Sequence, residues 1–200
     1  MRLQHPQPIT LFGIQSVMGP VRTLACWGTG TLLWLGGQAC AQTPPSVPSP
    51  PGAARFVQTP YSQPKVLLDV YLDHPEKMGA ALYWLRSLIN PLIEAPYSMD
   101  AEDMNVIVLL HGTELVTVAR KNEARYEEVV QRMRYYANLG VQFKVCGLAL
   151  KDFGYTLADM QPFVEVTPSA MTELVHWQNR GYALITPVVT EKKQATEEIR

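Results

Sequence analysis

The stretch that decides the fold runs from Tyr126 to Cys146 and reads YEEVVQRMRYYANLGVQFKVC. In its first part, apolar side chains recur every three or four residues and charged side chains fill the opposite face, which is typical of a helix lying on a sheet. Gly140 marks the end of that helix, because glycine is a common residue just after a helix. Residues 141–145 then read as a short buried strand. A helix followed directly by a strand is the repeating unit of an α/β protein.

The same unit recurs on both sides of this stretch. Amphipathic helix patterns also cover residues 78–89, where the pattern weakens at Asn90-Pro91, and residues 168–178. The five short aliphatic segments that we expect to form strands are residues 65–71, 105–110, 141–145, 164–166 and 182–185. Strands that alternate with helices need crossover connections, which give a parallel sheet with helices on both faces. We therefore predict a three-layer, doubly wound α/β domain over residues 65–187, and we take 2-1-3-4-5 as its strand order.

The chain before this domain looks like an export signal. Residues 24–37 (LACWGTGTLLWLGG) carry no charge, follow Arg22 and precede the small-residue triplet at 39–41. A basic start, a short apolar run and an A-x-A site are the parts of a secretory signal peptide, and the run is too short for a membrane span. We predict a signal peptide over residues 1–41, with Met18 as an alternative initiator. An uncleaved anchor is the alternative to cleavage.

Two further segments flank the domain, and the composition limits its partners. Residues 42–64 hold seven prolines and read as an extended linker, and residues 188–200 read as a polar tail. After cleavage we expect a periplasmic or secreted protein that is not held in a membrane. The 17 basic and 18 acidic side chains give a formal net charge of -1, so the sequence predicts no nucleic-acid partner.

Polar or reactive residues follow the first three predicted strands. These strands end at Asp73-His74, His111-Gly112 and Cys146-Gly147. Because ligands bind outside the carboxyl ends of an open parallel sheet, we expect both imidazoles and the thiol at one edge. With the order 2-1-3-4-5, the first strand would lie beside the third, and His74 would be the neighbour of Cys146.

Cys146 has two interpretations. It is the only cysteine outside the predicted signal peptide, and it stands between a strand and a helix that begins near Leu148. Backbone N–H groups at a helix start favour the thiolate, which is the nucleophile in sulfur transfer. The alternative is a small buried side chain that completes the third strand. The transfer mechanism requires that the sulfur be reachable from solvent at the sheet edge.

The two histidines are the other candidate site residues, and the sequence lacks the motifs of common metal, nucleotide and serine-nucleophile sites. His111 is a candidate acid, base or ligand, or a histidine bonded to the loop backbone, and His74 precedes a proline in a loop. A metal site built from both histidines and Cys146 has suitable ligand types, but no C-x-x-C or H-x-x-x-H spacing supports it, so we predict no metal. No glycine-rich phosphate loop follows the first strand and no G-x-S-x-G occurs, so we predict no bound cofactor.

Three segments resemble the DsrE/DsrF-like family of sulfur-relay proteins. They are VIVLLHGTEL at 106–115, ANLGVQFKVCGLALKDFGY at 137–155 and VEVTPSAMTELVHWQNRGYALITP at 164–187. The resemblance implies a flavodoxin-like fold with five strands, assembly into trimers or hexamers, and a cysteine that carries sulfur as a persulfide between partner proteins. Cys146 matches that cysteine, and His111 matches the H-G that ends the second strand in similar exported members.

These observations lead to two expectations about function. The first is an exported DsrE-like protein that accepts or binds sulfane sulfur on Cys146, with His111 and His74 beside it and a sulfur-donor or acceptor protein as partner. The second is a non-catalytic oligomeric binding module for a metal or a partner protein at the sheet edge.

Overall fold

Five parallel strands form one sheet in the computed structural model, which describes residues 52–200. The strands are β1 (Lys65–Val70), β2 (Asn105–Leu110), β3 (Gln142–Cys146), β4 (Val164–Thr167) and β5 (Ala183–Ile185). The predicted signal peptide and most of the predicted linker lie outside the described residues. Among the described residues, no helix has the length and apolar character that crossing a membrane requires.

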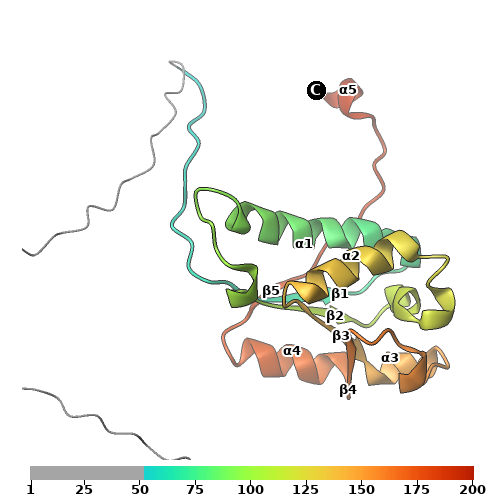
Figure 1. Cartoon of the computed structure of the whole chain (residues 1–200). Helices are drawn as coiled ribbons and strands as arrows, with labels where there is room; N and C mark the ends of the chain where they lie inside the picture. The colour runs from blue at the N-terminus through green and yellow to red at the C-terminus, as the bar shows by residue number, and fades with distance from the viewer. Residues whose placement is uncertain (1–51) are drawn as a thin grey trace, which may run out of the picture. The chain divides into compact units, whose positions relative to one another are not determined.

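Helices cover both faces of the sheet, which confirms the predicted α/β architecture (Figure 1). α1 (Met78–Ile93) and α2 (Glu127–Asn138) lie side by side on one face, and α3 (Gly147–Asp152) and α4 (Ala170–Gln178) lie on the other. α5 (Thr196–Ile199) is a single turn in the tail. Short 3-10 turns fill the connections at Pro75–Lys77, Ala101–Asp103, Thr113–Val118, Arg120–Asn122 and Leu157–Asp159.

The strand order is β4-β3-β2-β1-β5, so the predicted order 2-1-3-4-5 is wrong. β2, and not β1, pairs with β3. The physical reason lies in burial. Five of the six residues of β2 are buried, which suits a strand in the middle of the sheet, whereas β4 and β5 are partly exposed and form the two edges.

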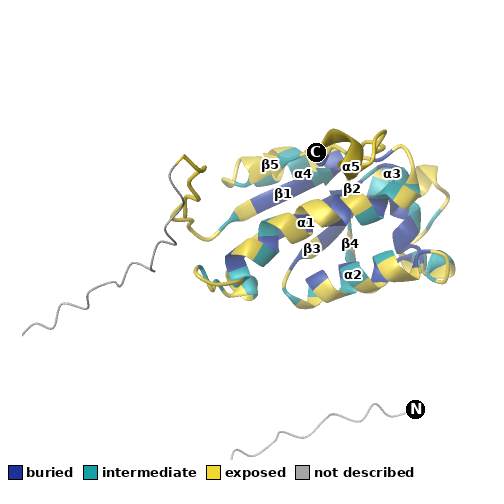
Figure 2. Ribbon diagram, turned by 90° about the horizontal axis from the view of Figure 1, so that it is seen from above, coloured by how far each residue is buried: buried dark blue, intermediate teal, exposed yellow. Residues whose placement is uncertain are grey.

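Side chains alternate between two unequal cores. The larger core lies under α1 and α2, and it takes Val66, Leu68 and Val70 from β1. The smaller core lies on the α3/α4 face and consists of Leu67, Ile107, Leu109, Cys146 and Ala170, with partly buried neighbours around it. Figure 2 shows the buried strands beneath the half-exposed helices α1 and α2.

α1 continues past the point where its sequence pattern weakens. The helix runs through Pro91 to Ile93, because Ile89 and Leu92 remain buried against the larger core and the turn is closed by the Glu94 N–H, which donates to the Asn90 carbonyl at 3.1 Å. Burial of the apolar face therefore outweighs the backbone bond that proline cannot make.

The connections leave β2 and β3 toward opposite faces. The chain after β2 leads to α2, and the chain after β3 leads directly to α3 on the other face. His111 directly follows β2 and Cys146 is the last residue of β3, so both lie at the carboxyl ends of neighbouring strands.

Candidate functional site

Neighbouring strands place His111 beside Cys146. β1 and β2 pair Val70 with Leu110, and β2 and β3 pair Leu110 with Val145. The same register continued by one residue aligns His111 with Cys146, on strands about 4.8 Å apart. Cys146 belongs to the smaller core. Because side chains alternate along a strand, His111 projects to that same face of the sheet.

His111 is held by a carboxylate from β1. Its Nε2 lies 2.7 Å from Asp69 Oδ1, and the two side chains are only 13% and 17% exposed. The Thr186 hydroxyl, after β5, lies 3.5 Å from the other oxygen of Asp69, and the Tyr71 ring centroid lies 5.0 Å from that of His111. A carboxylate on Nε2 assigns the proton of the neutral ring to this nitrogen, which leaves Nδ1 able to accept another proton.

Asp69 is a functional candidate that the sequence analysis missed. It stands within the apolar run KVLLDV and points to the α3/α4 face, two residues after the buried Leu67. The available signal was a single carboxylate directly after the aliphatic residues 66–68 and before Val70, because a charge inside such a strand requires a partner. The structure supplies that partner as His111.

A buried glutamate fixes the loop that follows β2. Glu114 is fully buried, and its carboxylate accepts hydrogen bonds from the N–H groups of His111 at 2.8 Å, Gly112 at 2.7 Å and Leu72 at 2.9 Å. Burial raises the pKa of Glu114 above its ordinary value, and the three N–H donors oppose that rise. Glu114 therefore ties the loops after β1 and β2 together and sets the backbone position of His111.

Cys146 is more enclosed than the sequence analysis expected. It is a free cysteine, but only 6% of its surface is exposed, and it contributes to the smaller core. Gly147 follows directly, and a Cβ there would lie 2.6 Å from the Thr167 carbonyl oxygen, so β3 and β4 approach closely at this turn. The α1/α2 groove and a hollow on α4 are lined by other residues. The thiol thus lies at the strand end, as expected, but beneath its neighbours.

His74 does not lie beside Cys146, which corrects the sequence expectation. β2 separates the strand that precedes His74 from β3. The His74 side chain is 62% exposed and contacts the Glu76 carboxylate, which also accepts a hydrogen bond from Arg125 at 2.8 Å. The neighbour of Cys146 is His111, and the misplacement of His74 follows from the wrong strand order. Within residues 52–200, no three His, Cys, Asp or Glu side chains are grouped closely enough to hold a metal ion.

Fold and site together define an α/β domain with a carboxylate–imidazole pair beside a single thiol at the carboxyl edge of its sheet. The chain belongs to the DsrE/DsrF-like family, whose model matches residues 66–187. A solved structure, that of a protein of unknown function, MTH1491 from Methanobacterium thermoautotrophicum, is similar with a TM-score of 0.50 and 21% identity. The similarity covers 62% of this chain and 100% of that one, and it supports the fold. No curated protein matches the chain.

Proposed function

We propose that this chain is an exported DsrE-like protein that accepts one sulfane sulfur on Cys146. The observation that carries the proposal is an arrangement of three side chains from three neighbouring strands. Asp69 of β1 contacts His111 after β2, and the register of β2 and β3 aligns His111 with Cys146. An imidazole held by a carboxylate is the usual partner that activates a cysteine nucleophile. Membership of the DsrE/DsrF-like family supports sulfur as the atom transferred.

In the proposed reaction, Nδ1 of His111 takes the proton of the Cys146 thiol, and Asp69 stabilises the imidazolium that forms. The thiolate then attacks the terminal sulfur of a hydropolysulfide. The new S–S bond makes Cys–S–SH, the S–S bond of the donor breaks, and the electron pair leaves with the shortened polysulfide. The transferred sulfur keeps its hydrogen, so atoms and charge balance.

The burial of Cys146 selects the kind of donor. Because only 6% of Cys146 is exposed, the cysteine of a folded protein is too bulky to reach it, and we take a small inorganic species as the donor. Delivery to an acceptor protein requires that the loops after β2 and β3 open. We therefore place a small polysulfide at the loading step and a partner protein at the unloading step.

Export and assembly are parts of the same proposal. The uncharged segment 24–37 and the triplet after it support cleavage at residue 41 and a periplasmic or secreted location. Exposed apolar side chains on α4, Met171 and Val175, support assembly of identical chains into a trimer or hexamer.

Intact-mass analysis after incubation with polysulfide tests the transfer. The background is a chain with Cys26→Ser and Cys40→Ser, so that Cys146 is the only thiol. We expect an added mass of one sulfur, removable with a reducing thiol and missing in the matched Cys146→Ser chain. An unmodified background protein, or an equal adduct on the Cys146→Ser chain, contradicts the proposal.

The burial of Cys146 also favours a second candidate, an oligomeric binding module without sulfur chemistry. In that case Cys146 is a core residue of the third strand. Counting the thiol with a reagent in the native and then in the unfolded protein separates the candidates. If the protein is such a module, the reagent reacts with Cys146 only after unfolding and the protein gains no sulfur. The Cys146→Ser variant then keeps any metal or partner binding.

A further inference from the structure

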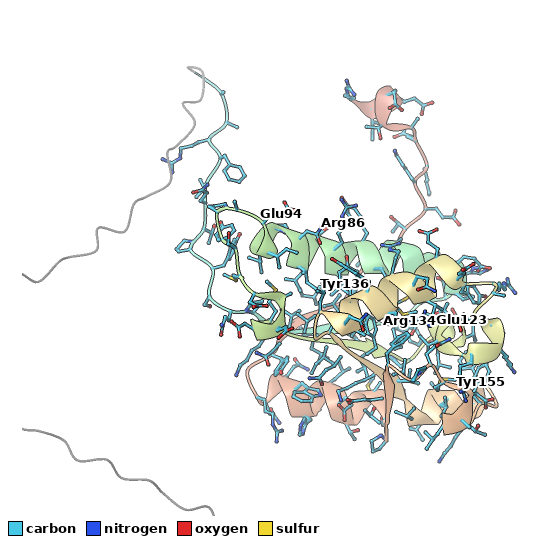
Figure 3. The ribbon with its side chains drawn as sticks, in the orientation of Figure 1. Arg86, Glu94, Glu123, Arg134, Tyr136 and Tyr155 are labelled. Carbon is cyan, nitrogen blue, oxygen red and sulfur yellow. The ribbon has the colours of Figure 1, made fainter. Side chains whose placement is uncertain are left out.

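A groove runs between α1 and α2 on the face of the sheet opposite to Cys146. Its volume is 990 Å³, and residues 188–190, which follow β5, form one side. Four aromatic side chains line it, two from each helix: Tyr83, Trp84, Tyr135 and Tyr136. Figure 3 labels Arg86 on α1 and Tyr136 on α2. The groove thus has one aromatic wall from α1 and one from α2, two helices of the same layer.

Three of these aromatic side chains are unusually open. Tyr83 is 60% exposed, Tyr135 is 56% exposed and Trp84 is 42% exposed. Large exposed aromatic side chains that gather in one groove mark a binding surface more often than a plain solvated face. Within residues 52–200, the rings keep this exposure although Arg86 lies over Tyr83 and Tyr136 packs against Tyr135.

The groove contains several hydrogen-bond donors, together with the Glu128 carboxylate and the Gln131 amide. The guanidinium of Arg86 lies 6.0 Å from the Tyr83 ring centroid. Arg132 donates to the Gly79 carbonyl at 3.2 Å and lies 3.9 Å from the Glu128 carboxylate, and a guanidinium has five N–H donors in all. The indole N–H of Trp84 and the tyrosine hydroxyls can also donate. A fitting ligand therefore has flat apolar rings together with carbonyl acceptors.

A segment of this same chain has that chemistry. Residues 44–51 read PPSVPSPP, with five prolines among eight residues. Such a sequence favours the polyproline II helix, in which proline rings pack on aromatic side chains and carbonyls point outward without N–H groups to compete. Aromatic grooves are the usual receptors for proline-rich segments, because the ligand loses little entropy on binding.

The chain is long enough to bring this segment to the groove. The Tyr61 ring lies 5.2 Å from that of Tyr97, just beyond the end of α1, so the linker passes that end of the helix. Trp84 lies nine residues back from Ile93, or roughly 14 Å along the helix axis. The nine residues 52–60 span roughly 28 Å when extended as polyproline II. We propose that residues 44–51 dock in the α1/α2 groove of their own chain as a polyproline II helix.

Fluorescence of Trp84 tests this docking in the full chain. The variant carries alanine at all five proline positions of the segment: Pro44→Ala, Pro45→Ala, Pro48→Ala, Pro50→Ala and Pro51→Ala. The matched control carries Pro60→Ala and Pro64→Ala, which lie outside the segment. The Trp84 signal is the difference between each chain and its Trp84→Phe counterpart. We expect acrylamide quenching of Trp84 to rise by about twofold in the variant and to stay unchanged in the control, because docking shields the ring.

A second measurement reads the same contact from the linker side. The double variant Tyr83→Ala and Tyr135→Ala removes two exposed rings, so its effect on stability should be small. If these rings hold the segment, its release should make tryptic cleavage after Arg55 several-fold faster. Equal quenching in the proline variant and its control, or equal cleavage rates, overturns the proposal. A quenching difference that grows with protein concentration also overturns it, since the occupant would then be the segment of a second copy.

Discussion

At the scale of single residues, the main question is what holds His111 next to Cys146. Asp69 fixes the ring through Nε2, and Glu114 fixes the backbone through the His111 N–H. Neither residue needs to touch a donor molecule, so both are positioning residues. Their substitutions should separate two effects, because Asp69 acts on proton transfer whereas Glu114 acts on the stability of the loop.

Asp69→Asn should slow sulfur loading and leave the fold intact. Asparagine can bond to His111, but it cannot stabilise the imidazolium, so we expect the loading rate at neutral pH to fall on the order of 100-fold. The difference between the two proteins should narrow as pH rises, because hydroxide from solution can then take the proton in place of His111. The measurement is the rate of persulfide formation by intact mass across pH. The control is Asp73→Asn, which removes an exposed carboxylate that pairs with Lys77. Equal rates for both variants at neutral pH refute a role for Asp69.

Glu114→Gln should destabilise the protein. An amide puts an NH2 group where one carboxylate oxygen now accepts an N–H, so at least one buried donor loses its partner. We expect a loss of about 1–3 kcal/mol in the free energy of unfolding, measured by urea denaturation. Glu102→Gln makes the same change at an exposed site and should cost almost nothing.

The difference in stability between wild type and Glu114→Gln should also depend on pH. Burial raises the pKa of Glu114 in the folded state above its unfolded value, so the protonated form is the one the fold favours. This contribution is fully present below the unfolded pKa and is lost as pH rises through the folded pKa. The difference in unfolding free energy between wild type and Glu114→Gln should therefore shrink from about pH 4 upward. A difference that grows with pH would mean that the three N–H donors outweigh burial.

At the scale of elements, the close contact between the end of β3 and β4 positions the thiol. Gly147→Ala places a Cβ 2.6 Å from the Thr167 carbonyl, so one of the two strands must shift. We expect a loss of about 1–3 kcal/mol in stability and an altered rate of thiol modification at Cys146. Gly79→Ala, within α1, is the control. Its Cβ meets only side chains of α2 at ordinary contact distances, Arg132 at 3.7 Å and Val129 at 4.0 Å, so the change should stabilise by about 0.5–1 kcal/mol. If Gly147→Ala matched the wild type in stability and in thiol reactivity, the turn would be able to accommodate the added methyl group.

The helices and strands were largely predictable from the sequence, and their order was not. Period 3.6 in residues 126–137 and continuous aliphatic runs in the strands identify the elements locally. Strand order depends on which strand is buried on both faces, and NVIVLL of β2 carried that signal, because it is the longest aliphatic run without an internal charge. Taking the order from a common topology instead placed β1 between β2 and β3 and His74 beside Cys146.

At the scale of the whole molecule, the sequence predicts only those site residues that stand at the ends of strands. Cys146 and His111 stand directly at strand ends, so the sequence placed both at the carboxyl edge. Asp69 lies inside a strand, and its contact with His111 spans 42 residues, which only the pairing of β1 with β2 brings together. The burial of Cys146 likewise depends on Leu67 and Ala170, which come from other parts of the chain.

The α3/α4 face is also where assembly should occur. Met171 and Val175 stand exposed on α4 above a small core, and a hollow of 560 Å³ lies between them and Asn179. A charge in the middle of an apolar contact between copies would be buried without a partner, so Val175→Glu should dissociate a trimer or hexamer into monomers. The measurement is molar mass by light scattering on a size-exclusion column.

The matched control is Leu157→Glu, the same change at an exposed apolar residue in a 3-10 turn. If α4 forms the contact, Leu157→Glu keeps the wild-type mass and Val175→Glu does not. Wild-type mass for both variants would move the interface elsewhere, and monomeric wild-type protein would remove the oligomer from the proposal. Sulfur loading of the Val175→Glu monomer adds a further distinction. Because Asp69, His111 and Cys146 all come from one chain, loading should persist in the monomer, and its loss would mean that a neighbouring copy completes the site.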